Sequence, residues 1–252
     1  MSKLKAVILA AGKGTRMKSD LPKVLHEIDG ISMVEYVIQA AREAGAEEIC
    51  LVVGHKAELV QARVGDGVTY VLQEEQLGTG HAVRCAGDFI GTEGDTMILC
   101  GDTPIITGET LKELLAYHRS NEMKVTVLST ILEDATGYGR IVRDENGNFL
   151  RIVEQKDASP EEQKIREINS GMYVFRSADL SDSLKKLKND NVQKEYYLTD
   201  TIEIINSQKQ ASEGVVVGAM ATERADETRG VNTVEQLEEA AGILRARQGS
   251  KA

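Results

Sequence analysis

The sequence of 252 residues has no tryptophan and only three phenylalanines and three cysteines. Without a series of aromatic side chains, it offers no platform on which the bases of a nucleic acid could stack. The cysteines are too few and too widely spaced for a zinc site or a disulfide framework, so we expect buried, reduced thiols. They are Cys50, Cys85 and Cys100.

Long apolar runs and an excess of positive charge are also missing. No run approaches the ~20 apolar residues that cross a bilayer, and the apolar stretch near the N-terminus lacks a signal-peptide cleavage pattern. We therefore expect a cytoplasmic protein. The formal net charge of −10 at pH 7 argues against nucleic acid or an anionic membrane as a partner. An acidic chain that binds phosphates must concentrate its cations locally.

Apolar runs that end at glycine or turn residues alternate with amphipathic segments in the first half of the chain. This β-α-β-α order predicts an α/β fold, a doubly wound and mostly parallel sheet whose ligands bind beyond the carboxyl ends of the strands. The predicted strands are 6–10, 49–53, 68–72, 96–100 and 125–128, and the predicted helices are 31–45, 57–62, one from about 81, and 110–121.

The second half predicts a β-rich insertion. Runs at 140–142 and 149–153 flank an Asn-Gly turn and indicate a β-hairpin, and the polar stretch 155–166 is expected to be a loop or short helix. The other predicted elements are strands at 171–175 and 215–217 and helices at 178–187, 199–207 and 233–247, the last with Val234, Leu237, Ala241 and Leu244 facing inward.

The first strand ends in Ala11-Gly-Lys-Gly14, which Arg16 and Lys23 follow. Two glycines allow a tight turn that brings backbone N–H groups close to a ligand. The stretch is not a P-loop, because no Gly-Lys-Ser/Thr follows, and Met17 replaces the third glycine of a dinucleotide fingerprint. A bare pair of glycines is usually only a turn, but with two cations beside it we predict polyphosphate binding.

Two polar residues have both a structural and a functional interpretation. Asp102 lies in the turn Gly101-Asp-Thr-Pro104 after a buried strand, where it is a turn residue bonded to its own backbone or a ligand of Mg²⁺. Asn232 lies three residues before Glu235, which fits a helix N-cap. A metal-ligand role for its amide cannot be seen from spacing alone.

Three further polar residues are equally open. Gln73 is a polar loop residue or, if a nucleotide lies there, an amide that reads the base. Glu154 and Asn169 flank the polar stretch of the insertion. They are solvent-exposed strand ends or partners of sugar hydroxyls.

Several blocks together resemble the sugar-nucleotide pyrophosphorylases, and among them the N-terminal uridylyltransferase domain of the bifunctional GlmU family. The opening block, Leu9-Ala-Ala-Gly-Lys-Gly-Thr-Arg-Met17 with Pro22-Lys23, is typical of the whole superfamily. The similarity covers roughly residues 4–245. The more specific blocks are Gln73-Glu-Glu-Gln-Leu-Gly-Thr-Gly-His81, Gly137-Tyr-Gly-Arg140, Val153-Glu-Gln-Lys-Asp157, Glu167-Ile-Asn-Ser-Gly171 and Glu195-Tyr-Tyr-Leu-Thr-Asp200.

The resemblance implies Mg²⁺-dependent uridylyl transfer from UTP to N-acetylglucosamine 1-phosphate. The products would be pyrophosphate and UDP-N-acetylglucosamine, a precursor for peptidoglycan and the cell wall. Residues 1–232 would form the nucleotidyltransferase domain, and residues 233–252 a C-terminal helix and tail.

The resemblance also implies a role for individual residues. Arg16 and Lys23 would be the catalytic cations that hold the phosphates, and Asp102 with Asn232 would hold Mg²⁺. The other implied substrate contacts are Leu9, Ala10, Ala11 and Gly12 through the backbone, Gln73, Gly78 and Thr79 on uracil, Cys100 and Gly101 beside Asp102, and Gly139, Glu154, Asn169 and Thr199 in the sugar pocket.

The chain departs from the family at two points. Cys100 stands where many members have tyrosine, so a side-chain contact near the sugar is altered or absent. The family's second half is a left-handed β-helix that acetylates glucosamine 1-phosphate and builds a trimer. Since this chain has no such repeats, we expect no acetyltransferase activity and a monomer or weak oligomer.

Two other functions stay open at this point. The chain could transfer a nucleotidyl group to another sugar 1-phosphate, such as glucose 1-phosphate. It could also be a non-catalytic regulatory module that binds sugar nucleotides. Such a module is expected to have lost Arg16, Lys23 or Asp102, and all three are present.

Overall fold

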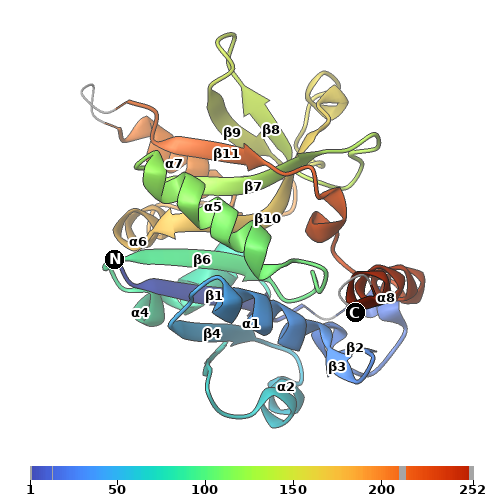
Figure 1. The fold of residues 1–252 in the computed structure, drawn as a ribbon. Helices are drawn as coiled ribbons and strands as arrows, with labels where there is room; N and C mark the ends of the chain where they lie inside the picture. The colour runs from blue at the N-terminus through green and yellow to red at the C-terminus, as the bar shows by residue number, and fades with distance from the viewer. Residues whose placement is uncertain (1, 13, 210–213, 250–252) are drawn as a thin grey trace.

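The apolar runs form the strands of one nine-stranded sheet, and the amphipathic segments form helices that pack on it (Figure 1). The computed structural model describes residues 2–12, 14–209 and 214–249. The strands are β1 (Leu4–Ala10), β2 (Glu27–Ile28), β3 (Ile31–Ser32), β4 (Glu48–Val53), β5 (Thr69–Leu72), β6 (Asp95–Cys100), β7 (Val125–Ile131), β8 (Arg140–Arg143), β9 (Phe149–Val153), β10 (Glu167–Arg176) and β11 (Val217–Ala221). The helices are α1 (Met33–Glu43), α2 (Ala57–Val64), α3 (Thr79–Cys85), α4 (Gly87–Ile90), α5 (Gly108–Ser120), α6 (Ser177–Leu184), α7 (Asp200–Ser207) and α8 (Val234–Gly249).

In the nine-stranded sheet the order of the strands is β11-β7-β10-β6-β1-β4-β5, with the β8–β9 hairpin attached to β10, while β2 and β3 pair in a separate two-stranded sheet. Strand β1 pairs in parallel with β4 and β6, and β4–β5 and β7–β11 are parallel as well. Strand β10 runs antiparallel to both of its neighbours. The prediction of a mostly parallel sheet with a β-hairpin insertion is therefore confirmed. Because the four parallel strands β5, β4, β1 and β6 lie side by side, their carboxyl ends share one edge.

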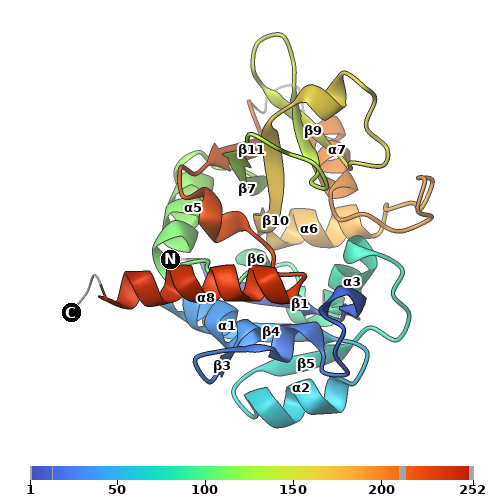
Figure 2. The same cartoon turned by 90° about the vertical axis from the view of Figure 1, so that its right-hand side faces the viewer.

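Helices cover both faces of this sheet, as a doubly wound fold requires. Alternate side chains of β1 enter different cores: Ile8 packs on the side of α1, α2 and α5, and Val7 packs on the side of α3, α4, α6 and α7. Both side chains are fully buried. Figure 2 shows the helices on the two faces of the sheet, with α5 on one side and α3, α6 and α7 on the other. Among the described residues, no helix is long and apolar enough to cross a membrane.

Helix α1 shows how local sequence fixes an element. The stripe that includes Met33, Val34 and Val37 is buried, as its spacing predicts. The helix begins in a capping box, in which the Ser32 N–H donates to Glu35 Oε2 at 2.8 Å and the Ser32 side chain accepts from the first turn.

Two details of the sequence prediction are wrong. The last strand is β11, Val217–Ala221, and not 215–217, and Val215 is exposed. The valine run marks only the start of the strand, because the Gly218-Ala-Met-Ala221 stretch that continues it is poor in β-branched residues. In α8, Ala241 is buried as expected, but Val234 is 48% exposed because the first turn of the helix extends beyond the surface it covers.

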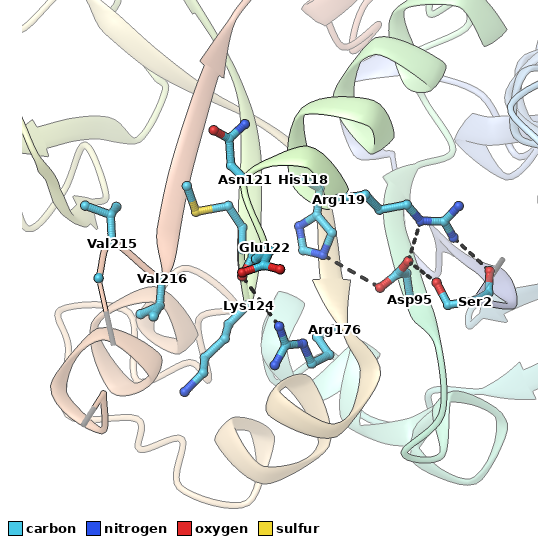
Figure 3. A pocket seen from close by; sticks show the side chains of 12 residues that line it. Ser2, Asp95, His118, Arg119, Asn121, Glu122, Lys124, Arg176, Val215 and Val216 are labelled. Atoms are coloured by element: carbon cyan, nitrogen blue, oxygen red, sulfur yellow. Dashed lines mark hydrogen bonds and ion pairs between the residues drawn. The ribbon is translucent and has the colours of Figure 1, made fainter. Parts of the chain in front are cut away.

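The amino-terminal edge of the sheet holds a charged cluster around Asp95, the first residue of β6 (Figure 3). Asp95 Oδ2 accepts from Arg119 Nε at 2.8 Å and from Ser2 Oγ at 3.0 Å, and His118 Nε2 lies 3.7 Å from Oδ1. Burial alone would raise the pKa of this carboxyl, but His118, Arg119 and Ser2 outweigh it and lower the pKa to about 2. The cluster lines a polar cavity of about 740 Å³, at the opposite edge from the carboxyl ends of the strands.

We predict that Asp95→Asn destabilises the protein by about 2 kcal/mol at pH 7, because a carboxyl whose pKa falls on folding stabilises the folded state. This contribution is present above the unfolded-state pKa of ~4 and is lost as the pH falls toward the folded-state pKa of about 2. Urea unfolding of both proteins between pH 3 and 7 should show a constant difference that shrinks below pH ~4. Exposed Asp182→Asn is the control and should change little; a difference for Asp95→Asn that grows toward low pH would contradict the prediction.

Candidate active site

The carboxyl ends of β1, β5 and β6 surround a cavity of about 340 Å³. Glycines permit the close approach: a Cβ at Gly54 would lie 2.7 Å from Ala11 O, and one at Gly101 would lie 3.0 Å from Leu9 O. The sequence-predicted residues that line this cavity are Leu9, Ala10, Ala11, Gly12, Lys23, Gln73, Gly78, Thr79, Cys100 and Asp102. Gly101 lies behind this lining, where its N–H donates to Leu9 O at 2.9 Å and joins β1 to β6.

The two glycines of the opening loop have different roles, which the sequence does not distinguish. Gly12 is exposed, and a Cβ there would meet nothing within 4 Å, so its backbone is open to the cavity. Gly14 has φ +61°, and a Cβ there would lie 2.5 Å from the Cβ of Lys23. The second glycine therefore makes room for the lysine side chain. Lys13 lies outside the described residues.

Four polar residues from distant parts of the chain meet at the mouth of the cavity. Lys23 Nζ forms an ion pair with Asp102 Oδ2 and donates to Asn232 Oδ1 at 3.0 Å. Arg16 Nη2 donates to the same Asn232 oxygen at 2.7 Å. Two cations thus face one carboxylate, so the centre has a local excess of positive charge although the chain is acidic. This is the local concentration of cations that phosphate binding requires.

Asn232 is not the N-cap of the last helix, contrary to the structural interpretation of its position. Helix α8 begins at Val234, and Thr233 Oγ1 accepts from Gln236 N at 3.3 Å. The Asn232 amide instead donates through Nδ2 to Gly230 O at 3.2 Å. This hydrogen bond turns Oδ1 toward Lys23 and Arg16. The Asp102 carboxylate likewise pairs with Lys23 across the site, which favours its interpretation as a functional residue over that of a turn residue bonded to its own backbone.

The loop after β5 is held against the segment 195–198. Gln73 is 4% exposed, and its Nε2 donates to Gly78 O at 3.2 Å. Gly80 N donates to Tyr196 O at 2.8 Å, and Thr79 Oγ1 accepts from Leu198 N at 3.1 Å. The guanidinium carbon of Arg84 on α3 lies 4.5 Å from the centre of the Tyr196 ring, within cation–π range. The two most specific blocks of the sequence therefore form one wall.

A second cavity of about 340 Å³ adjoins the first on the other side of Asp102. Its lining includes Arg16 and Asn232 together with the loop 136–138. Cys100 and Asp102 line both cavities. A molecule that extends from one cavity into the other would pass directly over the Lys23–Asp102–Asn232 centre.

The four residues predicted for a sugar pocket form one cluster beside Cys100. A Cβ at Gly139 would lie 3.5 Å from Glu154 Oε2, and Thr199 Oγ1 donates to Glu154 Oε1 at 3.1 Å. Asn169 N donates to Gly139 O at 2.9 Å, and Asn169 Oδ1 accepts from Gly171 N at 2.9 Å. Since Asn169 is only 9% exposed, it is not a solvent-exposed strand end. These four residues line neither of the two cavities.

Burial, together with neighbouring acidic side chains, raises the pKa of two carboxyls near this cluster. Burial raises the pKa of Glu154, the Thr199 hydroxyl opposes this, and Asp157 and Glu195 add to it. Burial, with Glu203 and Glu154, raises the pKa of Asp200 to about 6. Clustered carboxyls with raised pKa values are found at binding and catalytic sites and also in structural networks.

Cys100 connects the two parts of the site. Its Sγ donates to Gly171 O at 3.4 Å, and burial, with the Asp102 charge, raises the pKa of the thiol to about 12. The thiol is therefore neutral. Cys50 is buried as predicted, but Cys85 and Cys100 are only half-buried, because each lies at the end of its element.

Sequence reasoning missed several lining residues. Val24, Gln76, Ala82 and Glu195 line the first cavity, and Thr136, Gly137 and Tyr138 line the second. Most of them lie inside or next to the blocks that carry the family resemblance, so proximity to those blocks was the available signal. Apolar Val24 and Ala82 give no chemical signal in the sequence.

A family model described as Nucleotidyl transferase matches residues 5–219. In sequence, the chain is similar to proteins named Bifunctional protein GlmU. It is 51% identical to that of Caldanaerobacter subterraneus subsp. tengcongensis, covering 100% of this chain and 54% of the relative. It is 53% identical to that of Pelobacter propionicus, with 98% of this chain and 53% of the relative covered. It is 47% identical to that of Clostridioides difficile, with 96% of this chain and 52% of the relative covered. The chain spans about half the length of the curated relatives it matches.

In structure, the chain is similar to a solved UDP-glucose pyrophosphorylase complexed with UDP-glucose. The TM-score is 0.77 over 98% of this chain and 100% of that chain, at 20% sequence identity. At this identity the likeness shows the shared fold.

We predict that Gly78→Ala destabilises the protein by about 1–3 kcal/mol. Gly78 has φ +107°, and a Cβ there would lie 2.6 Å from Tyr196 O, so alanine is strained and pushes the loop off the 195–198 segment. Thermal or urea unfolding measures the loss. Gly87→Ala is the matched control: nothing lies within 4 Å of a Cβ there, and alanine should be neutral or stabilising at this helical position. Equal stabilities of the two variants would show that the loop accommodates the side chain.

Proposed function

The chain belongs to the nucleotidyl transferase family, and on that premise we propose that it transfers the uridylyl group of UTP to N-acetylglucosamine 1-phosphate. The products are UDP-N-acetylglucosamine and pyrophosphate, and the substrates place the enzyme in the cytoplasm. Identity of about 50% to proteins named GlmU supports this choice. The observation that carries it is the meeting of Arg16, Lys23 and Asp102 with Asn232 between two adjoining cavities.

The first cavity would hold the nucleotide. The chain at Leu9 to Gly12, whose backbone is exposed at Gly12, would contact the nucleotide, and the buried Gln73 amide would read uracil together with Gly78 and Thr79. The Gln73 amide is already held before the base arrives, because its Nε2 donates to Gly78 O at 3.2 Å and lies 3.1 Å from His81 Nδ1, which lowers the entropic cost of binding. On the other side of Cys100, Gly139, Glu154, Asn169 and Thr199 would hold the sugar.

The reaction is an in-line displacement at the α-phosphorus of UTP. A phosphate oxygen of the sugar 1-phosphate forms the new P–O bond, and the bond from the α-phosphorus to the β-bridging oxygen breaks, with its electron pair leaving on pyrophosphate. No proton transfer and no covalent enzyme intermediate are needed. The protein's contribution is therefore to position the two phosphates and to offset their charge. Arg16 and Lys23 would stabilise the charge that builds on the departing pyrophosphate.

The residues at the centre fit a divalent cation. Asp102 Oδ2 and Asn232 Oδ1 already converge on one cation, the Lys23 ammonium, and the Asn232 amide is held with its oxygen facing inward. A carboxylate and an amide oxygen suit Mg²⁺, which takes its other ligands from phosphates and water. When bound there, Mg²⁺ would neutralise phosphate charge and orient both substrates.

A pyrophosphate-release assay over a panel of nucleoside triphosphates and sugar 1-phosphates, with and without Mg²⁺, tests this function. We expect release with UTP and N-acetylglucosamine 1-phosphate in the presence of Mg²⁺. Faster release with glucose 1-phosphate or with thymidine triphosphate would assign another specificity. No release with any pair, together with measurable binding of the sugar nucleotide, would assign a non-catalytic binding module.

We predict that Asp102→Ala abolishes turnover and leaves the fold intact, because it removes the carboxylate that pairs with Lys23 and that would hold Mg²⁺. Pyrophosphate release measures turnover, and circular dichroism with thermal unfolding checks the fold. The control is Asp182→Ala, which removes an exposed carboxylate far from the site. A folded Asp102→Ala protein with near-normal release would remove Asp102 from the mechanism.

We predict that Arg16→Ala lowers kcat about 10²–10³-fold, the range seen when a donor to developing charge is removed. Arg16 is exposed and hydrogen-bonds only to the Asn232 amide among the described residues, so the fold should tolerate its loss. Steady-state kinetics separate the two possible roles. If KM rises and kcat is unchanged, Arg16 binds substrate and does not act on the transition state. Arg16→Lys keeps the charge and should recover part of the loss.

A further inference from the structure

Arg140 is a buried cation that the proposed reaction does not use. It is 2% exposed, at the first position of β8. Burial lowers the pKa of the Arg140 guanidinium, and the negative charge of Asp134, an exposed residue, raises it. Its two hydrogen bonds go to neutral oxygens, and its buried Nε has no partner among the described residues. A buried charge without a bonded carboxylate costs several kcal/mol, so its retention calls for a physical reason.

Both oxygens that accept hydrogen bonds from Arg140 are connected to the loop 136–138. Nη1 donates to the carbonyl of Tyr138, and Nη2 donates to Gln155 Oε1 at 2.8 Å. The same Gln155 oxygen accepts from Gly137 N at 3.2 Å. Arg140 and Gln155 therefore bind the backbone of residues 137 and 138 by hydrogen bonds. Asp134 Oδ1 accepts from Thr136 N at the start of the turn.

This loop forms part of the wall of the second cavity. Thr136, Gly137 and Tyr138 line the cavity, which Arg16 and Asn232 of the charged centre also line. Thr136 and Gly137 are exposed, so little packing holds the loop from above. The chain continues directly into Gly139 of the predicted sugar pocket, and Gln155 follows Glu154 of that pocket. The anchor is therefore adjacent in sequence to two sugar-pocket residues and touches neither cavity itself.

We propose that Arg140 is a positioning residue that holds the 136–138 loop in place to receive the sugar 1-phosphate. The proposal rests on the proposed function for the identity of that substrate. The planar fork of the guanidinium reaches the Tyr138 carbonyl and the Gln155 amide oxygen at the same time, which a single ammonium cannot do in the same geometry. Arg140→Lys keeps the charge and loses this bridge.

The test combines kinetics with amide hydrogen exchange of Arg140→Lys and Gln155→Met. Loss of the anchor should raise KM for the sugar 1-phosphate about tenfold and leave KM for UTP within twofold, because the UTP cavity is lined by other loops. Exchange at 135–139 should become faster in both variants, and the double variant should be no worse than the worse single one, since both residues act through one anchor. Arg143→Lys, on the same strand but paired with Glu167, is the matched control and should change neither readout.

Each other outcome overturns the proposal. Equal rises of KM for both substrates, or a fall in kcat alone that follows the folded fraction, would show that Arg140 only stabilises the fold. Unchanged exchange at 135–139 in Arg140→Lys would show that the loop does not depend on it. If the enzyme prefers a different sugar 1-phosphate, or shows no turnover, the exchange result still decides the anchor, so failure of the proposed function is distinguishable.

Discussion

The Lys23 ammonium, bound between the Asp102 carboxylate and the Asn232 amide, is the interaction on which the rest of the site depends. Lys23 is separated by 79 residues from Asp102 and by 209 from Asn232. Only the parallel sheet brings these three segments to one point: β1 and β6 are neighbours, so the turns after them are adjacent, and the 229–233 segment reaches the same turn through the bond from Val231 N to Asp102 O. The fold therefore creates the positive centre that the net acidic composition does not favour.

The hydrogen bonds between the loop after β5 and the segment before α7 have a similar role for the nucleotide cavity. They join the parallel half of the sheet, which carries Gln73, to the part of the chain that carries Thr199. Because Gly78 and Gly80 are in backbone contact with residues 195–197, a shift on one side moves the other. The loop that carries the predicted base-reading residues and the segment that leads to Thr199 are thus hydrogen-bonded to each other, although Gln73 and Thr199 are 126 positions apart.

Much of this arrangement could be predicted from the sequence, and the failures have specific causes. The strands, most helices and the edge where ligands bind follow from apolar periodicity, because burial on both faces leaves a continuous run. The structural and functional interpretations of Asn232 could not be separated, since a polar residue before a helix fits both; only the bond to Gly230 O, made after folding, shows which way its amide points. The room that Gly14 leaves for Lys23 could not be predicted either, because these two neighbours in space are nine positions apart in the sequence. Arg140 stood in one of the family blocks, but its role could not be predicted, because burial of a charge is a property of the tertiary structure.

The Cys100 position shows how such a site can change one contact and keep the others. The thiol donates to Gly171 O, and Gly171, at φ +80°, has so little room that a Cβ there would lie 2.9 Å from the sulfur. Cys100 is therefore held by the protein's own backbone and offers a substrate only a small, neutral surface. Under the proposed function, discrimination between sugars would come from groups with fixed partners of their own. Asn169 is held by Gly171 N, and Glu154 is held by Thr199. Because both are already oriented before a substrate arrives, a sugar that fails to satisfy them would leave half-buried polar atoms unpaired, which is how hydrogen-bonding sites reject a wrong substrate.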